Sequence, residues 1–281
     1  MPARILHDNY GKSRVRLLKV ARSGEFHEVQ NLTLNIALEG DFEAIHVRGD
    51  NSACLPTDTM KNTVYALAGE RSEIEEVEAF GQRLAQHFLV NNQQVSRATI
   101  DLVEHGWKRM KFDGEKHPHS FVKGSDEKRT AKITATRGRV TVESGVEDLI
   151  VLKTAASGFA GFIKDPFTTL PETDDRVLST AIKANWRYTH PDAADDDVFH
   201  AIRRTILSEF SDHNSLSVQH TLYAIGDAIL ERFAVVDEIA FSLPNIHCLP
   251  VDISKFGVEN TNSIFVPTDE PHGLIEARLA R

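Results

Sequence analysis

A short repeated stretch constrains the fold of this chain more than any other feature of its sequence. Residues 63–67 read T-V-Y-A-L, and residues 221–225 read T-L-Y-A-I. Both stretches lie near the start of a segment whose apolar residues recur with helical spacing. Aligning the two copies places Thr57 opposite Ser215. A match at equivalent points of two similar segments predicts that the chain is a tandem duplication.

The spacing of apolar residues predicts the same order of elements in both halves. Alternation of apolar and polar residues is typical of strands with one buried face, and recurrence every three or four residues is typical of helices. In the first half this predicts strands at 14–20 and 32–38, helices from 57 and over 72–89, and strands at 97–106 and 129–143. In the second half it predicts strands at 149–154 and 183–190, helices at 197–212 and 215–233, and strands at 239–252 and 273–280.

These patterns predict an α+β protein made of two tandem ββααββ units. Each unit would have an antiparallel sheet with its helices on one face, since the strands alternate cleanly and the helices have one apolar stripe. We expect the first unit to comprise residues 1–144 and the second to comprise residues 145–281. The connection at 155–180 is long for a compact domain, which favours a functional role for it.

Composition and charge exclude several classes of partner. The 281 residues include 41 acidic and 32 basic side chains, which give a net charge of −9. This balance argues against a nucleic-acid binder or a protein of anionic membrane surfaces. Two cysteines form no disulfide framework, and the start of the chain lacks a hydrophobic signal core. The final tripeptide is not S-K-L, so we expect a cytoplasmic location.

The sequence also lacks the usual cofactor motifs. It has no G-x-G-x-x-G, no Walker loop and no G-x-S-x-G. His117-Pro118-His119 could supply two metal ligands, but no further residues at ligand spacing complete a site. We therefore expect neither a metal nor a bound cofactor.

A polar pair near the C-terminus is a candidate for chemistry. Residues 235–241 predict a strand, and Asn245 and His247 follow it two residues apart. Side chains at this spacing point to one side of a sheet. Pro244 and Pro250 cannot donate to a strand partner, so the sheet pairing is interrupted there. The pair could equally be structural, satisfying polar groups of a nearby loop.

Nine motifs, found in order along nearly the whole chain, resemble the urate oxidase (uricase) family. They are Y-G-K at 10–12, T-D-T-M-K-N-T at 57–63, H-P-H-S-F at 117–121, L-K-T at 152–154, G-F-A-G-F at 158–162, T-T-L-P-E-T-D-D-R at 168–176, S-V-Q at 217–219, S-L-P-N-I-H at 242–247 and G-L-I at 273–275. The resemblance implies the tunnelling fold (T-fold), with two ββααββ units per subunit. It also implies a homotetramer around a tunnel, and urate and O2 as substrates without a cofactor.

The resemblance further implies a substrate pocket. Phe159 would be the floor on which the purine stacks, and Arg176 and Gln219 would clamp its polar edges. Leu170 and Val218 would form the wall, with backbone groups of Val218 and Asp58 adding polar contacts, and Ile275 would also contact the substrate. Judged alone, Phe159 is more typical of a core residue and Arg176 of a surface ion pair.

The resemblance assigns a proton relay to Lys12, Thr57 and His247. Asn245, facing Thr57, would hold O2 and a catalytic water above the ring. A base near a positive group suits removal of a proton from the urate anion, because a second negative charge develops there. The active site would be shared between subunits, since Lys12 and Thr57 belong to one repeat and Phe159 and Arg176 to the other.

Two other functions stay open at this point. Another T-fold enzyme of purines or pterins, such as a cyclohydrolase or a pterin synthase, would typically need a histidine-rich metal site or a glutamate anchor. A purine-binding protein without chemistry would have no use for the relay of Lys12, Thr57 and His247. The leading prediction is a urate oxidase that gives 5-hydroxyisourate and hydrogen peroxide.

Overall fold

The computed structural model describes residues 3–281, which form two compact units. One unit contains the residues up to Gly145 together with Arg187–Phe199, and the other contains Val146–Trp186 and His200–Arg281. Within the described residues, no helix is both long and apolar enough to cross a membrane.

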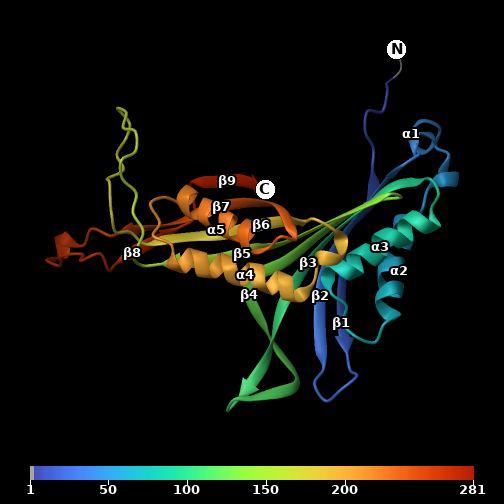
Figure 1. The fold of residues 1–281 in the computed structure, drawn as a ribbon, viewed down its shortest axis with the longest axis horizontal. Helices are drawn as coiled ribbons and strands as arrows, with labels where there is room; N and C mark the ends of the chain where they lie inside the picture. The colour runs from blue at the N-terminus through green and yellow to red at the C-terminus, as the bar shows by residue number, and fades with distance from the viewer. Residues whose placement is uncertain (1–2) are drawn as a thin grey trace. The chain divides into compact units, whose positions relative to one another are not determined.

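The first unit is an antiparallel sheet with helices on one face (Figure 1). Its strands pair in the order β1-β2-β3-β4. Their bounds are β1 Tyr10–Ala21, β2 Glu28–Gly40, β3 Val95–Phe112 and β4 Glu115–Thr136, and the helices are α1 Glu43–Arg48, η1 Asn51–Ala53, α2 Thr57–Gly69 and α3 Val77–Asn91. Helix α2 packs on β1, and α3 packs on β3 and β4.

The core of the first unit follows from the alternation seen in the sequence. On β2, Leu32, Leu34, Ile36 and Leu38 are all buried and share one face. Helix α2 contributes Met60 and Val64 to the core, and α3 contributes several apolar side chains at helical spacing: Phe80, Leu84 and Phe88. Burying apolar area in this way supplies most of the free energy that holds the helices on the sheet.

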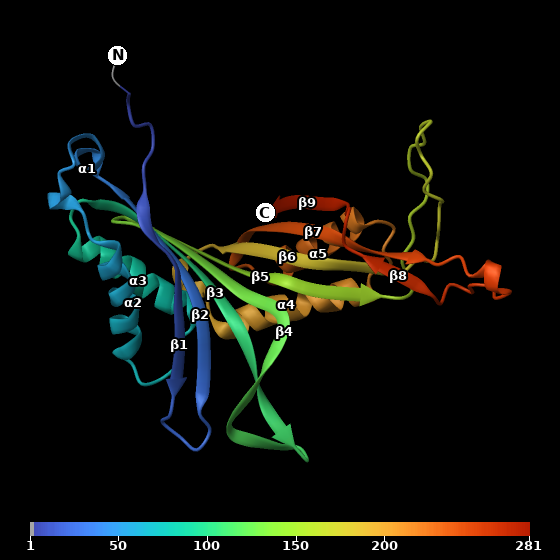
Figure 2. The same cartoon turned by 180° about the vertical axis from the view of Figure 1, so that it is seen from behind.

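The second unit also combines strands with two long helices (Figure 2). Strand β7 pairs antiparallel with both β8 and β9. The bounds of the remaining elements are β5 Arg139–Lys153, β6 Leu178–Tyr188, η2 Pro191–Ala193, α4 Asp196–Asp212, α5 Val218–Arg232, β7 Val236–Pro250, η3 Ser254–Phe256, β8 Phe265–Thr268 and β9 Leu274–Ala280. Of these, η2 and the first residues of α4 belong to the first unit. Helix α5 packs on β7 and β9. The predicted α+β class is confirmed.

An ion-pair network that is buried at Glu78 and half exposed at Asp196 joins residues 187–199 to the first unit. Arg129 on β4 donates to Glu78 at 2.5 Å and to Asp196 at 2.6 Å. Glu78 is fully buried, and the Arg129 guanidinium lies 4.1 Å from the centroid of the Phe199 ring. Asp196 and Phe199 start helix α4, so this network ties the start of that helix to the first sheet.

Several predicted elements have other bounds in the structure, and two of these differences have a local cause. The strand expected at 129–143 is in fact the end of β4 and the start of β5, with a turn at residues 137–138. The Arg137 side chain fixes that turn by donating to the carbonyls of Leu89 and Gln93. The helix expected from residue 72 begins at Val77, because the Glu75 carbonyl accepts a hydrogen bond from the Gln30 side chain instead.

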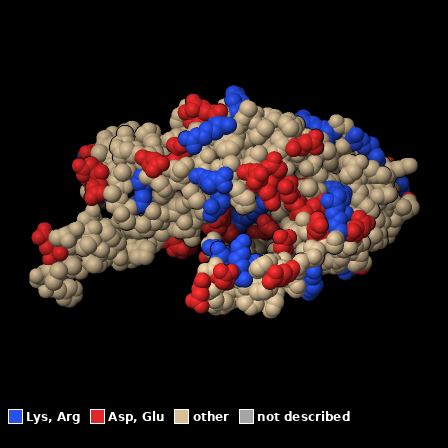
Figure 3. Space-filling view, turned by 60° about the horizontal axis from the view of Figure 1, so that its bottom comes forward, with Lys and Arg blue, Asp and Glu red and all other residues tan. Residues whose placement is uncertain are grey.

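Charged side chains of both signs are interspersed on the face shown in Figure 3. A surface of this kind, with the net charge of −9, keeps a protein soluble without concentrating charge of one sign.

Candidate active site

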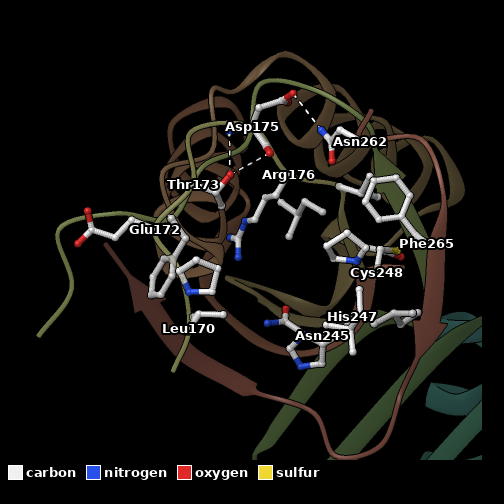
Figure 4. A pocket seen from close by; sticks show the side chains of 18 residues that line it. Leu170, Glu172, Thr173, Asp175, Arg176, Asn245, His247, Cys248, Asn262 and Phe265 are labelled. Carbon is white, nitrogen blue, oxygen red and sulfur yellow. Dashed lines mark hydrogen bonds between the residues drawn. The ribbon is translucent and has the colours of Figure 1, made fainter. Parts of the chain in front are cut away.

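A pocket of about 560 Å³ lies in the second unit. It is lined by the connection between β5 and β6, the start of β6, the end of β7 and the start of β8 (Figure 4). Five residues assigned from the sequence line it: Phe159, Leu170, Arg176, Asn245 and His247. The pocket is large enough for a bicyclic ligand with solvent, since ligand sites usually range from about 300 to 1,000 Å³.

Backbone pairing outside the regular sheet shapes one wall of this pocket. Ser157 forms a short parallel bridge with Ser215. In this bridge the Gly158 N–H donates to the Ser215 carbonyl at 2.8 Å, and the Ser215 N–H donates to the Ala156 carbonyl at 2.9 Å. The chain then returns so that the Arg176 N–H donates to the Ser157 carbonyl at 2.8 Å. These main-chain hydrogen bonds, which we call the frame, hold segments that are distant in sequence next to one another.

The same frame fixes the Phe159 ring. Phe159 and Thr173 exchange two backbone hydrogen bonds, of 2.7 and 3.1 Å. The ring stacks on Phe162 with centroids 4.9 Å apart and an angle of 17° between the planes. The guanidinium of Arg176 lies 5.3 Å from the Phe159 centroid. Phe159 is only partly buried, which leaves ring surface for a ligand.

Helix α5 begins immediately after the bridge. The Ser217 hydroxyl accepts the His220 N–H at 3.1 Å, which is the capping pattern that starts a helix. Val218 and Gln219 therefore occupy the first turn, where Val218 is buried and Gln219 is exposed. Neither residue lines the pocket, and neither does Ile275, which pairs with Leu243 across β7 and β9.

Two buried polar atoms in the pocket have no hydrogen-bond partner among the described residues. They are Nη2 of Arg176 and Oδ1 of Asn245. Most buried polar groups are satisfied, and an unsatisfied one costs about 1–3 kcal/mol. An unused cationic donor and an unused carbonyl acceptor line the same pocket (Figure 4). This arrangement suits a ligand that offers an anionic or carbonyl oxygen together with an N–H group.

Burial also affects the charge of this arginine. Loss of water around the guanidinium lowers the pKa of Arg176 from its ordinary value. That ordinary value is so high that the side chain keeps its charge at neutral pH. The pocket therefore presents a partly dehydrated cation, whose attraction for an anionic ligand is stronger than it would be in bulk water.

The end of β7 positions Asn245 and His247. Pro244 has no N–H to donate to a neighbouring strand, and its carbonyl accepts a hydrogen bond from the Thr180 hydroxyl at 2.8 Å. The Asn245 N–H donates to the Gly273 carbonyl at 2.9 Å, and His247 is paired opposite Thr268. The side-chain carbonyl of Asn245 is not held by a loop, because Asn245 Oδ1 has no partner among the described residues.

The remaining assigned residues, Lys12, Thr57 and Asp58, lie in the first unit. Lys12 is on β1, two residues after Tyr10, so both side chains point to the same side of the strand. The Tyr10 hydroxyl accepts the Leu55 N–H at 2.8 Å, which holds the segment before α2 against β1. Thr57 is the first residue of α2.

The Asp58 carboxylate at this helix start is held in its charged form. Hydrogen bonding from Lys61 is the main reason that the pKa of Asp58 lies below its ordinary value, and the Lys12 charge adds to the effect. Gly11 precedes Lys12 where a side chain would collide with the backbone, since an added Cβ would lie 1.7 Å from the Ile36 carbonyl oxygen.

Comparison with known proteins identifies the family. The family model for uricase matches residues 8–134 and 142–276. A uricase from Arthrobacter globiformis is 40% identical over 274 residues, which cover 98% of this chain and 89% of that protein. The chain belongs to the uricase family. The prediction made from the sequence motifs is confirmed.

Other uricases agree in sequence and in structure. The uricase of Dictyostelium discoideum is 36% identical over 99% of this chain and 98% of its own length. The crystal structure of the uricase from Arthrobacter globiformis superposes with a TM-score of 0.95 and 39% identity, and covers 100% of this chain and 96% of that chain. The uricase fold is thus shared along the whole chain.

Sequence reasoning missed several residues of the pocket. Thr173, Val177, Cys248, Asn262 and Phe265 all line it. Asn262 also donates to the Asp175 carboxylate at 3.2 Å, which links the segment before β8 to the residue before Arg176. Thr173 lies inside a motif already noted at 168–176, so that motif could have indicated it. No pattern in the sequence indicates Asn262 or Phe265.

Because the side-chain oxygen of Asn245 has no hydrogen-bond partner among the described residues, we expect that removing it does not destabilise the protein. Replacing Asn245 with leucine removes a buried oxygen without a partner, so the free energy of unfolding should stay the same or rise by about 1 kcal/mol. Urea denaturation followed by circular dichroism measures this. The control is Thr180→Val, which leaves the Pro244 carbonyl without its donor and should cost about 1–3 kcal/mol. If Asn245→Leu lowers the free energy of unfolding as much as Thr180→Val does, the Asn245 side chain stabilises the fold. That result would contradict its assignment to ligand binding.

Proposed function

We propose that this uricase-family chain is a cofactor-independent urate oxidase. It converts urate, O2 and water into 5-hydroxyisourate and hydrogen peroxide. The observation that carries the proposal is the pair of unsatisfied atoms, Arg176 Nη2 and Asn245 Oδ1, in the pocket of a chain that belongs to this family. A urate anion offers a carbonyl oxygen to the arginine, and the water held above the ring offers an O–H group to the amide carbonyl of Asn245.

The second unit supplies the binding groups in this proposal. The purine stacks on Phe159, beside the guanidinium that lies 5.3 Å from the ring centroid. Arg176 donates to the anionic edge, and Gln219 on the first turn of α5 offers an amide to the opposite edge. Leu170, Val218 and Ile275 contribute apolar contacts.

The first unit supplies the base. Lys12 takes a proton from urate through the Thr57 hydroxyl and a water, and His247 completes the relay. Asp58 adds a backbone contact at the start of α2, where the unpaired N–H groups favour negative charge. Asn245, facing Thr57, holds O2 and then the attacking water above the ring.

The chemistry needs no external electron carrier. Removal of the proton leaves an electron-rich dianion, which transfers two electrons to O2 and binds it as a peroxide at a ring carbon. The relay returns the first proton to the peroxide, hydrogen peroxide leaves with a second proton from a ring nitrogen, and water adds across the resulting C=N bond at the same carbon. Urate has then lost two electrons and O2 has gained them, which balances the reaction. The protein residues have only to bind urate and O2, to orient them and to move protons.

The proposed site residues are divided between the two units, and the proposed oligomer explains how they come together. We propose tandem T-fold units at 1–144 and 145–281, in a homotetramer that encloses a tunnel. In such an oligomer the Lys12 group of one subunit meets the Arg176 group of its neighbour, and a two-fold axis makes two sites per pair. A cytoplasmic location, with no nucleic-acid or membrane partner, stays part of the proposal.

The two other functions are less well supported. A cyclohydrolase or pterin synthase of the same fold would not be expected to share up to 40% identity with uricases along the chain. A purine binder without chemistry would not need Lys12 and Thr57 beside a helix start.

Substitutions in the relay and the clamp should affect different kinetic constants. Lys12→Met should lower kcat for urate by about 10²–10⁴-fold with little change in KM, because a positioned base contributes in the transition state. Arg176→Ala should mainly raise KM, because it removes the charged donor to the ring. Steady-state loss of urate absorbance measures both. A Lys12→Met enzyme within a few-fold of the unmodified kcat would refute the assignment of Lys12.

Mixed oligomers test whether the active site is shared. Lys12→Met and Gln219→Ala subunits, each nearly inactive alone, should regain part of the activity when they are co-expressed. In a mixed pair one site collects both substitutions and the other collects none. Two different affinity tags allow isolation of oligomers that contain both chains. Each variant co-expressed with a tagged copy of itself is the control.

A site built within a single chain would give a different result with mixed oligomers. If each site were built within one chain, every site of a mixed oligomer would carry one substitution. Purified mixed oligomers with no more activity than their parents would therefore exclude the shared site.

A further inference from the structure

We propose that Ser157 is a positioning residue for urate binding. Its hydroxyl fixes the plane of the Arg176 guanidinium, so that the nitrogen without a protein partner faces the pocket. The inference rests on the proposed function, because it concerns how the same pocket holds urate, and it adds a residue that none of the nine family motifs contains.

The contact that carries this inference is a single side-chain hydrogen bond. Nε of Arg176 donates to Oγ of Ser157 at 3.3 Å. Ser157 is fully buried, with 0% of its surface exposed, so water cannot replace its hydroxyl. A terminal nitrogen of the same guanidinium, Nη2, is buried without a partner among the described residues. One nitrogen is therefore anchored to the protein, while another is left for the ligand.

A planar guanidinium needs more than one contact to fix its orientation. The Arg176 group lies 5.3 Å from the centroid of the Phe159 ring, which restricts its position but lets its plane turn about the Cδ–Nε bond. The bond from Nε to Ser157 removes that freedom. A flexible arginine loses about 2 kcal/mol of rotamer entropy when it is ordered, so ordering it before urate arrives favours binding.

The backbone of Ser157 has a separate role that a side-chain substitution leaves intact. Its carbonyl accepts the Arg176 N–H at 2.8 Å, and its bridge with Ser215 is made by main-chain groups. The Ser215 hydroxyl is used elsewhere, since it accepts from Thr221 at 2.7 Å and donates to the Ser217 carbonyl at 3.1 Å. Ser157 is thus the residue whose hydroxyl acts on Arg176.

The first test is equilibrium binding of urate without O2, so that no turnover occurs. Equilibrium dialysis with urate absorbance should give a Kd about 10-fold higher for Ser157→Ala, because a hydrogen bond to a charged group is lost. In air, KM should rise by a similar factor while kcat changes by less than about threefold. Ser157→Cys keeps the shape with a weaker acceptor and should fall between the two.

A matched control is available in the same unit. Thr205 is also buried, with 5% of its surface exposed, and its hydroxyl donates to the Ala201 carbonyl on α4. Thr205→Val removes a buried hydroxyl far along the chain from the Arg176 contact, and it should leave the Kd for urate unchanged. If Ser157→Ala does not yield folded protein, Ser157→Cys supplies the comparison.

A double-substitution cycle separates positioning from a general structural effect. Lysine has no Nε, so in an Arg176→Lys background the Ser157 hydroxyl has lost its partner. Ser157→Ala should then cause no further rise in Kd. An equal rise in both backgrounds, or an unchanged Kd in the Arg176 background, would overturn the inference. Urate that binds without being oxidised would instead refute the proposed function, and the cycle would still decide the role of Ser157.

Discussion

The short parallel bridge between Ser157 and Ser215 is the contact on which the candidate site depends. Its main-chain hydrogen bonds of 2.8 and 2.9 Å join the residues that follow β5 to the residues that precede α5. Phe159 follows two residues later, Arg176 is bound back to Ser157, and Gln219 lies on the first turn of the helix. Because main-chain atoms make these bonds, the position of the site is set by the path of the chain. Side chains then determine its chemistry.

Two buried polar atoms of the pocket have no hydrogen-bond partner among the described residues, and they explain why the pocket favours a polar ligand. A folded chain that aims Arg176 Nη2 and Asn245 Oδ1 into one pocket gives up about 1–3 kcal/mol for each of them. A ligand that satisfies both atoms recovers that free energy on binding. The same reasoning explains why the guanidinium must be anchored at Nε. An unanchored arginine could turn to find a partner within the protein, and the pocket would lose its cation.

Much of the fold was predictable, because it depends on periodicity. The alternation at 32–38 and the helical spacing from Met60 to Leu67 each describe a single buried face, and β2 and α2 have those faces. The turn at 137–138 was missed because apolar alternation continues on both sides of it. Pocket residues such as Phe159 and Arg176 came from resemblance to the uricase family, since a loop residue carries no periodic signal. Asn262 and Ser157 depend on contacts between distant segments, which only the structure reveals.

The central claim is that the chain's own residues oxidise urate with O2 as the sole electron acceptor. The most direct test is to measure three quantities together on purified protein that has been dialysed against a metal chelator. These are urate loss by absorbance, O2 uptake by electrode and peroxide by a coupled peroxidase assay run in parallel. The account predicts one O2 consumed and one hydrogen peroxide formed for each urate lost, at an undiminished rate. Activity that disappears after chelation and returns only when a metal is added would contradict it.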